Sequence, residues 1–203
     1  MNVRAEEILA YWFGGADRTD PSADDLKARI TLWFESGSEL DAEVTRRFAG
    51  DLERAVRGEY DDWEDNARDM LALIVILDQF PRNIHRGSPL AFSYDARSLA
   101  LTQAAIARGF EASYSPVHRV VLYLPLMHSE DLEVQRVALA SYKKLFDDSS
   151  EALRAQMVNV LRAAERHFEI IERFGRYPHR NKTVGREMTP TEVAFLTEPK
   201  SSF

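Results

Sequence analysis

The sequence has 203 residues, of which 45% are apolar, and a formal net charge of −7. This size and apolar content predict one domain over residues 1–203 with a substantial core. The absence of cysteine excludes disulfides, thiolate chemistry and cysteine-ligated metal. The acidic balance argues against non-specific binding to nucleic acid or to an anionic membrane surface. The first residues, MNVRAEEILAYWF, lack the pattern of a signal peptide, so we expect a cytoplasmic protein.

The N-terminal third of the chain predicts three helices. Apolar residues recur at helical spacing, and glycines or cap residues stand at each boundary. These helices are predicted at residues 2–13, 22–36 and 38–57. The cap chemistry at every boundary makes the helical interpretation consistent along this region.

Eight successive apolar residues, Met70 through Leu77, follow these helices. A segment that is apolar on every side belongs inside the protein, and eight residues are too few to cross a bilayer. Helix-start residues precede this segment, and no glycine or proline interrupts it before Pro81. We therefore predict a buried helix over residues 64–80, enclosed by other helices.

The rest of the chain predicts further helices, at residues 95–108, 116–124, 130–146, 150–174 and 190–196. Proline is poorly tolerated inside a helix, so we expect a break at Leu124–Pro125, with His128 in or beside the kink. Ser129 is the expected cap of the helix at residues 130–146, and Val137 is among its expected inward residues.

No segment shows a sustained two-residue alternation, so the predicted fold is all-α with no sheet. Several predicted helices are joined by a tight glycine turn, as in antiparallel helix hairpins. A weak internal repeat at an offset of 51 residues relates Val56-Arg57-Gly58 to Ala107-Arg108-Gly109. A stack of antiparallel helix pairs is therefore favoured over a four-helix bundle.

Three strings in this sequence are unusual: LALIVILDQFPRNIHRG, LYLPLMHSED and RFGRYPHRN. Together with YWFG near the start and TPTEVAFL near the end, they resemble the motifs of the bacterial domain of unknown function 924 family. The resemblance spans nearly the whole chain and implies a TPR-like array of helix hairpins, an αα superhelix. It implies no activity, because the family has no established reaction and a fold alone does not define a function.

A first cluster of polar residues ends the predicted buried helix: Asp78, Gln79, Arg82 and Asn83. In a functional interpretation these side chains face a groove. In a structural one, the cationic and amide groups satisfy the last carbonyls of the helix, and Asp78 pairs with an arginine from another helix. For this cluster alone we favour the structural interpretation.

A second cluster follows the expected kink and contains His128, Glu130 and Asp131. His128 is a candidate base or ligand, oriented by a carboxylate. Equally, acidic residues are preferred in the first turn of any helix, and His128 would then bond a carbonyl group freed by Pro125. Both interpretations stay open.

A third cluster contains His167, Arg173, Arg176, His179, Arg180 and Asn181. His167 lies on the apolar stripe of its helix, where a core histidine is commoner than a catalytic one. The other members belong to the basic segment from Arg173 to Arg186, which contains five arginine and lysine residues and no acid. Arginine forks suit carboxylate or phosphate groups, so this segment is a candidate anion cradle. The alternative is that it lies across the acidic body of the protein and fastens the C-terminus, since structural ion pairs imitate sites.

The leading functional hypothesis is a binding module for an anionic group, either an acidic peptide or carboxylate or a phosphorylated small molecule. The candidate ligand-binding residues are Gln79, Arg82, Asn83, Arg173, Arg176, His179, Arg180 and Asn181. We expect side chains from all three clusters to line one concavity: Asp78 or Arg82, His128 or Glu130, and Arg176 or His179.

Two alternatives remain. One is a small hydrolase or isomerase with His128 as general base, oriented by Asp78 or Glu130. The other is a purely structural protein–protein interaction module. The common nucleophile, nucleotide and metalloprotease motifs are absent, and no histidine–carboxylate pair has the spacing of a metal site, so we expect neither metal nor cofactor. Sequence alone does not decide whether the protein is an enzyme.

Overall fold

The structure is a computed structural model that describes residues 2–18, 21–35, 37–199 and 201, without the side chains of residues 34 and 35. Within these residues all regular structure is helical and no strand occurs, as the sequence predicted. The α-helices are α1 (Val3–Phe13), α2 (Ala23–Glu35), α3 (Ser38–Val56), α4 (Ala67–Ile74), α5 (Phe80–Ile84), α6 (Asp95–Ala107), α7 (Pro116–Leu122), α8 (Leu124–His128), α9 (Leu132–Asp147), α10 (Glu151–Phe174) and α11 (Pro190–Phe195).

Shorter helical turns connect several of these helices. They are η1 (Gly14–Ala16), η2 (Asp61–Asp65), η3 (Val75–Gln79), η4 (Pro89–Phe92), η5 (Phe110–Ser113) and η6 (Pro178–Arg180). All are 3₁₀ turns except η3, which is a π-helical turn. No described helix combines the length and apolar character that crossing a bilayer requires.

The predicted buried segment is confirmed at the centre of the fold. Every residue from Met70 to Leu77 is 0% exposed. The predicted limits of 64–80 are wrong at both ends, because α4 begins at Ala67 and helical structure continues through Pro81 to Ile84. Asn66, one of the helix-start residues before the segment, is the N-cap, and its side chain accepts a hydrogen bond from Asp69 N–H.

The π-helical turn explains why Pro81 does not end the helix. Proline has no N–H to donate, and its ring crowds the carbonyl group four residues earlier. In η3 the Phe80 N–H donates instead to the Val75 carbonyl, five residues back, which widens the helix just before the proline. The chain therefore continues as α5, and the wide turn holds Asp78 and Gln79 in the protein interior, where they are 1% and 6% exposed.

The predicted break near Pro125 falls at Tyr123, between α7 and α8. Pro125 lies in the first turn of α8, where the missing N–H is not needed. Asp131, not Ser129, caps α9, and its Oδ1 accepts hydrogen bonds from Glu133 N–H at 2.8 Å and Val134 N–H at 3.1 Å.

One predicted core position of α9 is wrong. Val137 is 50% exposed, because the buried stripe of α9 passes through Gln135, Ala138, Tyr142 and Leu145 instead. The sequence pattern alone does not choose between adjacent positions at the edge of an apolar stripe.

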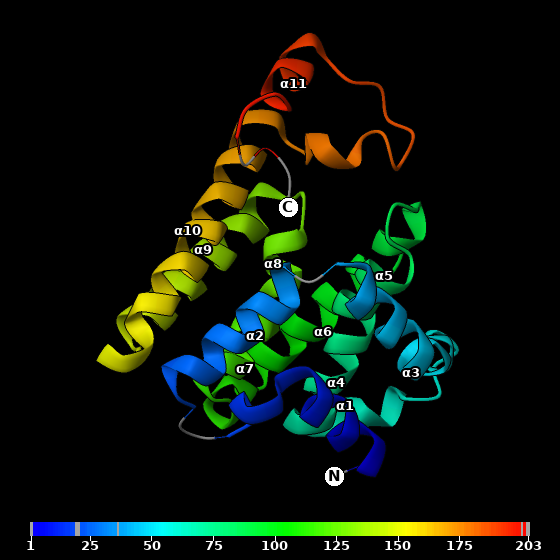
Figure 1. Cartoon of the computed structure of the whole chain (residues 1–203), viewed down its shortest axis with the longest axis vertical. Helices are drawn as coiled ribbons and strands as arrows, with labels where there is room; N and C mark the ends of the chain where they lie inside the picture. The colour runs from blue at the N-terminus through cyan, green and yellow to red at the C-terminus, as the bar shows by residue number, and fades with distance from the viewer. Residues whose placement is uncertain (1, 19–20, 36, 200, 202–203) are drawn as a thin grey trace.

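The C-terminal third is built on the hairpin of α9 and α10, which lie side by side in Figure 1. Gly175 ends α10 with a φ of 66°, a left-handed conformation that glycine adopts at low cost. The chain then turns across one end of the molecule and returns through α11, which begins with a capping box between Thr189 and Glu192. A small separate apolar cluster holds this end together, with Tyr177 and Phe195 at its centre.

Candidate functional site

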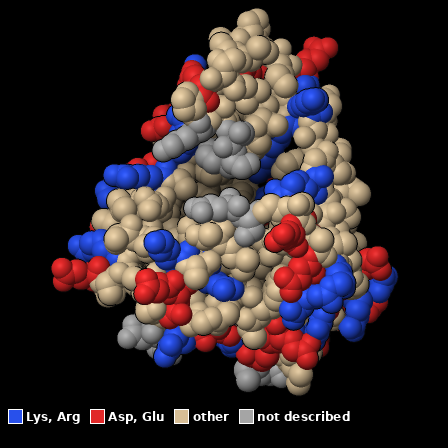
Figure 2. All heavy atoms as spheres, in the orientation of Figure 1, with Lys and Arg blue, Asp and Glu red and all other residues tan. Residues whose placement is uncertain are grey.

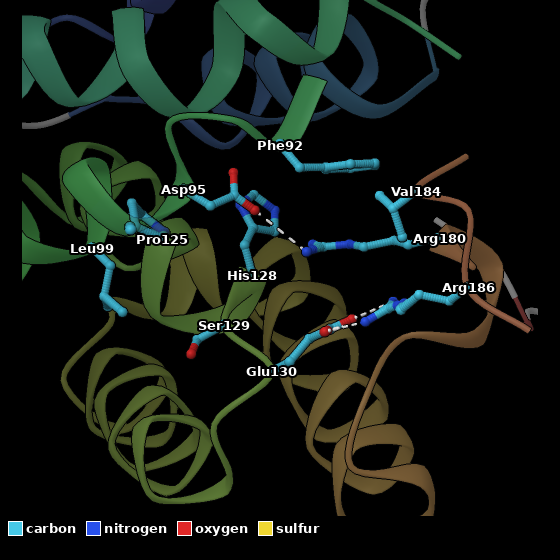
Figure 3. A pocket seen from close by; sticks show the side chains of 11 residues that line it. Phe92, Asp95, Leu99, Pro125, His128, Ser129, Glu130, Arg180, Val184 and Arg186 are labelled. Atoms are coloured by element: carbon cyan, nitrogen blue, oxygen red, sulfur yellow. Dashed lines mark hydrogen bonds and ion pairs between the residues drawn. The ribbon is translucent and has the colours of Figure 1, made fainter. Parts of the chain in front are cut away.

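A cavity of about 330 Å³ opens between three parts of the chain (Figure 3). One wall comes from η4 and the start of α6, the floor from the end of α8, and the opposite wall from the segment after α10. The lining residues are Phe92, Asp95, Ala96, Leu99, Pro125, His128, Ser129, Glu130, Arg180, Val184 and Arg186. This size lies at the lower end of the range for small-molecule sites.

An aspartate–histidine pair stands at the floor of this pocket. Nδ1 of His128 lies 2.9 Å from Oδ1 of Asp78, although the two residues are 50 positions apart. The π-helical turn places Asp78 in the interior, and the short helix α8 begun by Pro125 carries His128 at its last residue. The His128 side chain is 13% exposed and lines the pocket, whereas Asp78 lies behind it at 1%.

The protonation states follow from the surroundings. Burial works against the Asp78 anion, but the charge of Arg82 and the hydrogen bonds from His128 and Gln79 outweigh it and hold the pKa of Asp78 below its usual value. Burial and the nearby Arg82 lower the pKa of His128, so its imidazole is neutral at pH 7. Nδ1 then donates to Asp78, and Nε2, which bonds no described residue, keeps its lone pair available on a ring that lines the pocket.

Two arginines share one carboxylate at the pocket wall. Asp95 accepts hydrogen bonds from Arg82 at 2.9 and 3.2 Å, and it also accepts one from Arg180 Nη1 at 3.3 Å. The Arg180 guanidinium lies between the rings of Phe92 and Tyr177, 4.6 Å from each centroid. Arg180 is only 9% exposed, and its Nε has no hydrogen-bond partner among the described residues. The Nε of Arg186 is likewise buried and without a partner among the described residues, so the two pocket arginines share this unusual feature.

A second ion pair closes the pocket beside His128. Both terminal nitrogens of Arg186 donate to Glu130 (Figure 3). Glu130 also accepts a hydrogen bond from Tyr177 N–H at 2.8 Å. The Glu130 carboxylate therefore binds donors of the segment after α10. It does not orient His128, and Asp78 does.

Several candidates from the first and third clusters have structural roles outside the pocket. Asn83 donates to Asp41 at 2.9 Å, and Gln79 donates to Asp78. Arg173 lies 3.7 Å from Glu198. None of these side chains lines the pocket. The structural interpretation expected Asn83 to satisfy a carbonyl at the end of its helix, but Asn83 bonds a carboxylate of α3 instead. Arg82 does satisfy a helix carbonyl, because its Nη1 donates to the Asp78 carbonyl oxygen at 2.6 Å.

Arg176 and Asn181 also serve the fold. Arg176 donates to Glu192 at 2.6 and 2.8 Å, and Asn181, which is 0% exposed, donates to the same carboxylate at 3.2 Å. These contacts fasten α11 to the end of α10. His179 packs its ring against Tyr177, with 5.5 Å between the centroids, and burial followed by the charge of Arg180 lowers its pKa to about 4.

The predicted meeting of three clusters in one concavity needs correction. His128 and Glu130 line the pocket as predicted, but Asp78 and Arg82 lie behind its wall. Arg176 and His179 do not line it, and Arg180 and Arg186 take their place. The reason is local: Pro178 and the turn η6 redirect the chain after Tyr177, so that the next arginines face the cavity.

Phe92 and Asp95 line the pocket, although no sequence pattern marked either as a site residue. Asp95 was expected only at the start of a helix, a position typical of aspartate. It occupies that position in α6 but makes no capping hydrogen bond, and its side chain turns to the arginines instead. No pattern in the sequence distinguishes these two uses of an N-terminal aspartate.

A second polar pocket of about 380 Å³ contains another aspartate–histidine pair, which sequence analysis did not single out. His118 Nε2 lies 3.0 Å from Asp17, and His118 Nδ1 accepts a hydrogen bond from Ser115 N–H at 3.4 Å. Asp17 also accepts one from Arg68 at 2.7 Å. Both nitrogens of His118 are therefore engaged within the protein, and this pair connects η1 to α4 and α7 without leaving a lone pair for a ligand.

The fold and the pocket define an all-helical protein with a cavity lined by both apolar and charged side chains. The chain belongs to the family described as bacterial protein of unknown function (DUF924), whose model matches residues 8–200. It is similar to the solved structure of the protein of unknown function ATU0120 from Agrobacterium tumefaciens, at 36% identity and a TM-score of 0.74. That similarity covers 86% of this chain and 96% of the other. Among curated proteins no sequence matches significantly.

Proposed function

We propose that this protein is a small-molecule enzyme, a hydrolase or an isomerase, in which His128 is the general base. The observation that carries the proposal is the 2.9 Å contact between His128 Nδ1 and the buried Asp78 carboxylate at the floor of a pocket. A histidine whose other nitrogen is held by a carboxylate keeps one tautomer and one orientation.

The chemistry follows from that orientation. Nε2 of His128 takes a proton from a water molecule in a hydrolysis, or from a carbon of the substrate in an isomerisation. The imidazolium that forms is stabilised by Asp78, which stays ionised because Arg82 is close to it, 3.6 Å away. Burial keeps the resting imidazole neutral, so it is ready to accept the proton at pH 7.

The substrate is proposed to carry an anionic group, which Arg180 anchors. Of the arginines in the basic segment, Arg180 and Arg186 face the cavity. Arg186 is held by Glu130 through two hydrogen bonds, whereas Arg180 has one longer contact of 3.3 Å with Asp95 and is the freer of the two to bind an anion. Phe92, Leu99 and Val184 add apolar surface to the same cavity. A cavity of about 330 Å³ favours a small carboxylate or phosphorylated molecule over a long acidic peptide.

The binding-module hypothesis required several arginines of the basic segment to bind an external anion, but most of these arginines already have partners within the protein. Basic and acidic side chains are interspersed over the face drawn in Figure 2. Arg176 and Arg186 each hold a carboxylate with two hydrogen bonds, whereas Arg180 has a single hydrogen bond of 3.3 Å to Asp95. Anion binding is therefore proposed at Arg180 alone and as part of catalysis. A TPR-like stack of helix hairpins and a cytoplasmic location remain part of the proposal, the first supported by the α9–α10 hairpin.

The test is a substrate screen with matched variants. Purified protein is assayed against carboxylic and phosphoric esters for hydrolysis, and against small hydroxy and oxo acids in D₂O for proton exchange by NMR. For any substrate found, His128→Gln and Asp78→Asn should lower kcat/KM by about 10²–10⁴-fold, the usual contribution of general-base catalysis. His118→Gln, which alters the other aspartate–histidine pair, should keep kcat/KM within a few fold. Turnover that survives His128→Gln would contradict the proposal.

A further inference from the structure

We propose that Asp95 is a positioning residue that couples the anchoring of an anionic substrate at Arg180 to the basicity of His128. This inference rests on the proposed role of His128 as the base. It concerns how the same site responds to its substrate.

The coupling follows a chain of direct contacts. Asp95 Oδ2 accepts from Arg180 Nη1 at 3.3 Å, and its two oxygens accept from Arg82 at 2.9 and 3.2 Å. Arg82 Nη1 in turn lies 3.6 Å from Asp78 Oδ1, which is the oxygen that bonds His128. Asp95 is thus the only carboxylate that contacts both the pocket arginine and the arginine beside the dyad among the ion pairs of the described residues.

His128 is sensitive to this arrangement because charges surround it on several elements. The groups around it are Asp78 from η3, Arg82 from α5, Asp95 from α6, His167 from α10 and His179 from η6. Glu130, Arg180 and Arg186 line the same pocket as His128. These groups are largely buried, so each charge acts through little water and is weakly screened.

The resting site leaves two guanidinium groups to share the single carboxylate of Asp95. An anion bound to Arg180 supplies a second negative charge, and Asp95 is then free to neutralise Arg82 fully. The positive potential that Arg82 exerts on His128 falls, and the imidazole becomes a stronger base. The base is thereby strengthened when substrate is bound.

Asp95 also competes with the substrate for Arg180. Its removal has two opposite consequences that a merely structural residue would not produce together. The anion binds more tightly because Arg180 loses its internal carboxylate partner. His128 becomes less basic because Arg82, whose positive charge acts on it, loses the same carboxylate.

The experiment follows the Hε1 resonance of His128 by NMR during pH titrations, with inorganic sulfate as the probe and chloride of equal ionic strength as the reference. The resonance is assigned by its loss in His128→Gln. Sulfate should move the titration of wild-type His128 to higher pH than chloride does. In Asp95→Asn the titration should move to lower pH, and the dissociation constant for sulfate should fall about tenfold, a typical size for coupling between sites.

Two further variants act as controls. Asp95→Glu keeps the charge and should restore titration near the wild-type pH. Asp61→Asn removes an aspartate whose side chain is 64% exposed and lies 2.6 Å from Arg97, a residue of α6 like Asp95. This variant should leave the titration of His128 unchanged.

An unchanged His128 titration in folded Asp95→Asn, or an equal shift in Asp61→Asn, would overturn the inference. If Asp95→Asn does not fold, the wild-type comparison decides, and identical titrations in sulfate and chloride would overturn it. A failure of the proposed function is recognised by a different result, the survival of turnover in His128→Gln, which does not depend on the outcome of the NMR titration.

Discussion

Arg186 holds the carboxylate of Glu130 with both of its terminal nitrogens, at 2.6 and 2.9 Å, across 56 positions of sequence. The same carboxylate accepts the Tyr177 N–H, so the segment after α10 is fastened directly beside His128. Although burial opposes the charge, these donors keep the pKa of Glu130 below its usual value. The wall of the pocket thus depends on an ion pair that is only partly exposed, with side-chain exposures of 29% and 28%.

Arg186→Ala should loosen this wall without unfolding the protein. Because charge-assisted hydrogen bonds are lost at a site that is partly screened by solvent, we expect a cost of about 1–2 kcal/mol. Hydrogen exchange measured by mass spectrometry should become faster over residues 176–189 and remain as in the wild type over α4. Lys182→Ala, at an exposed position of the same segment, is the control and should change neither region. Equal protection of the segment in Arg186→Ala and the wild type would argue against a fastening role.

The second prediction separates two arginines of the basic segment. Arg176 binds the Glu192 carboxylate, which is 2% exposed and also caps Thr189 N–H at 2.7 Å. Arg176→Ala should therefore lower the melting temperature by several degrees, because Glu192 is left short of its cation. Arg173→Ala removes a contact of 3.7 Å at an arginine that is 53% exposed and should have little effect. Calorimetry that finds equal effects for both variants would contradict the different roles assigned to them.

Much of the helical architecture could be predicted because its causes are local. The apolar run from Met70 to Leu77 has no polar face in any helical period, so only a buried position suits it. The capping box of Thr189 and Glu192 and the stop at Gly175 are equally local, and the structure contains all three features. Such signals lie within a few residues of the element that they define.

The candidate site could be predicted only in part, because its geometry depends on long-range contacts. Asp78 and His128 each attracted attention, but their pairing requires the π-helical turn before Pro81, which no sequence pattern indicated. The choice of Arg180 over Arg176 depends on a single turn at Pro178. Asp95 matched a common helix-start position, so its contacts with two arginines gave no separate signal.

The third prediction concerns acid stability. His167 is 6% exposed, and its Nδ1 lies 2.7 Å from the Ala163 carbonyl oxygen, while burial lowers its pKa to about 3. The unfolded chain takes up a proton near the ordinary pKa of 6.5, so unfolding binds a proton between about pH 6.5 and 3. The contribution of the neutral His167 to the free energy of unfolding is fully present above pH 6.5. It is lost as the pH falls, by up to about 1.4 kcal/mol per pH unit.

Urea unfolding at a series of pH values measures this dependence. His167→Gln cannot take up the proton, so its free energy of unfolding should fall less steeply between about pH 6 and 4, by up to about 1.4 kcal/mol per unit. A comparison at pH 8, where the histidine is neutral in both states, isolates the packing cost of the substitution. Parallel pH profiles for the two proteins would rule out a buried neutral His167.

The tautomer of His128 decides whether its Nε2 can accept a proton from a substrate. Long-range ¹H–¹⁵N NMR correlation at pH 7 distinguishes the two neutral tautomers and the imidazolium directly. We predict the Nδ1–H form for His128, with an unprotonated Nε2, and the Nε2–H form for His118, whose Nδ1 accepts the Ser115 N–H. His118 therefore serves as an internal reference in the same spectrum. A His128 that is protonated at Nε2 at pH 7, as the other tautomer or as the imidazolium, would contradict its role as general base.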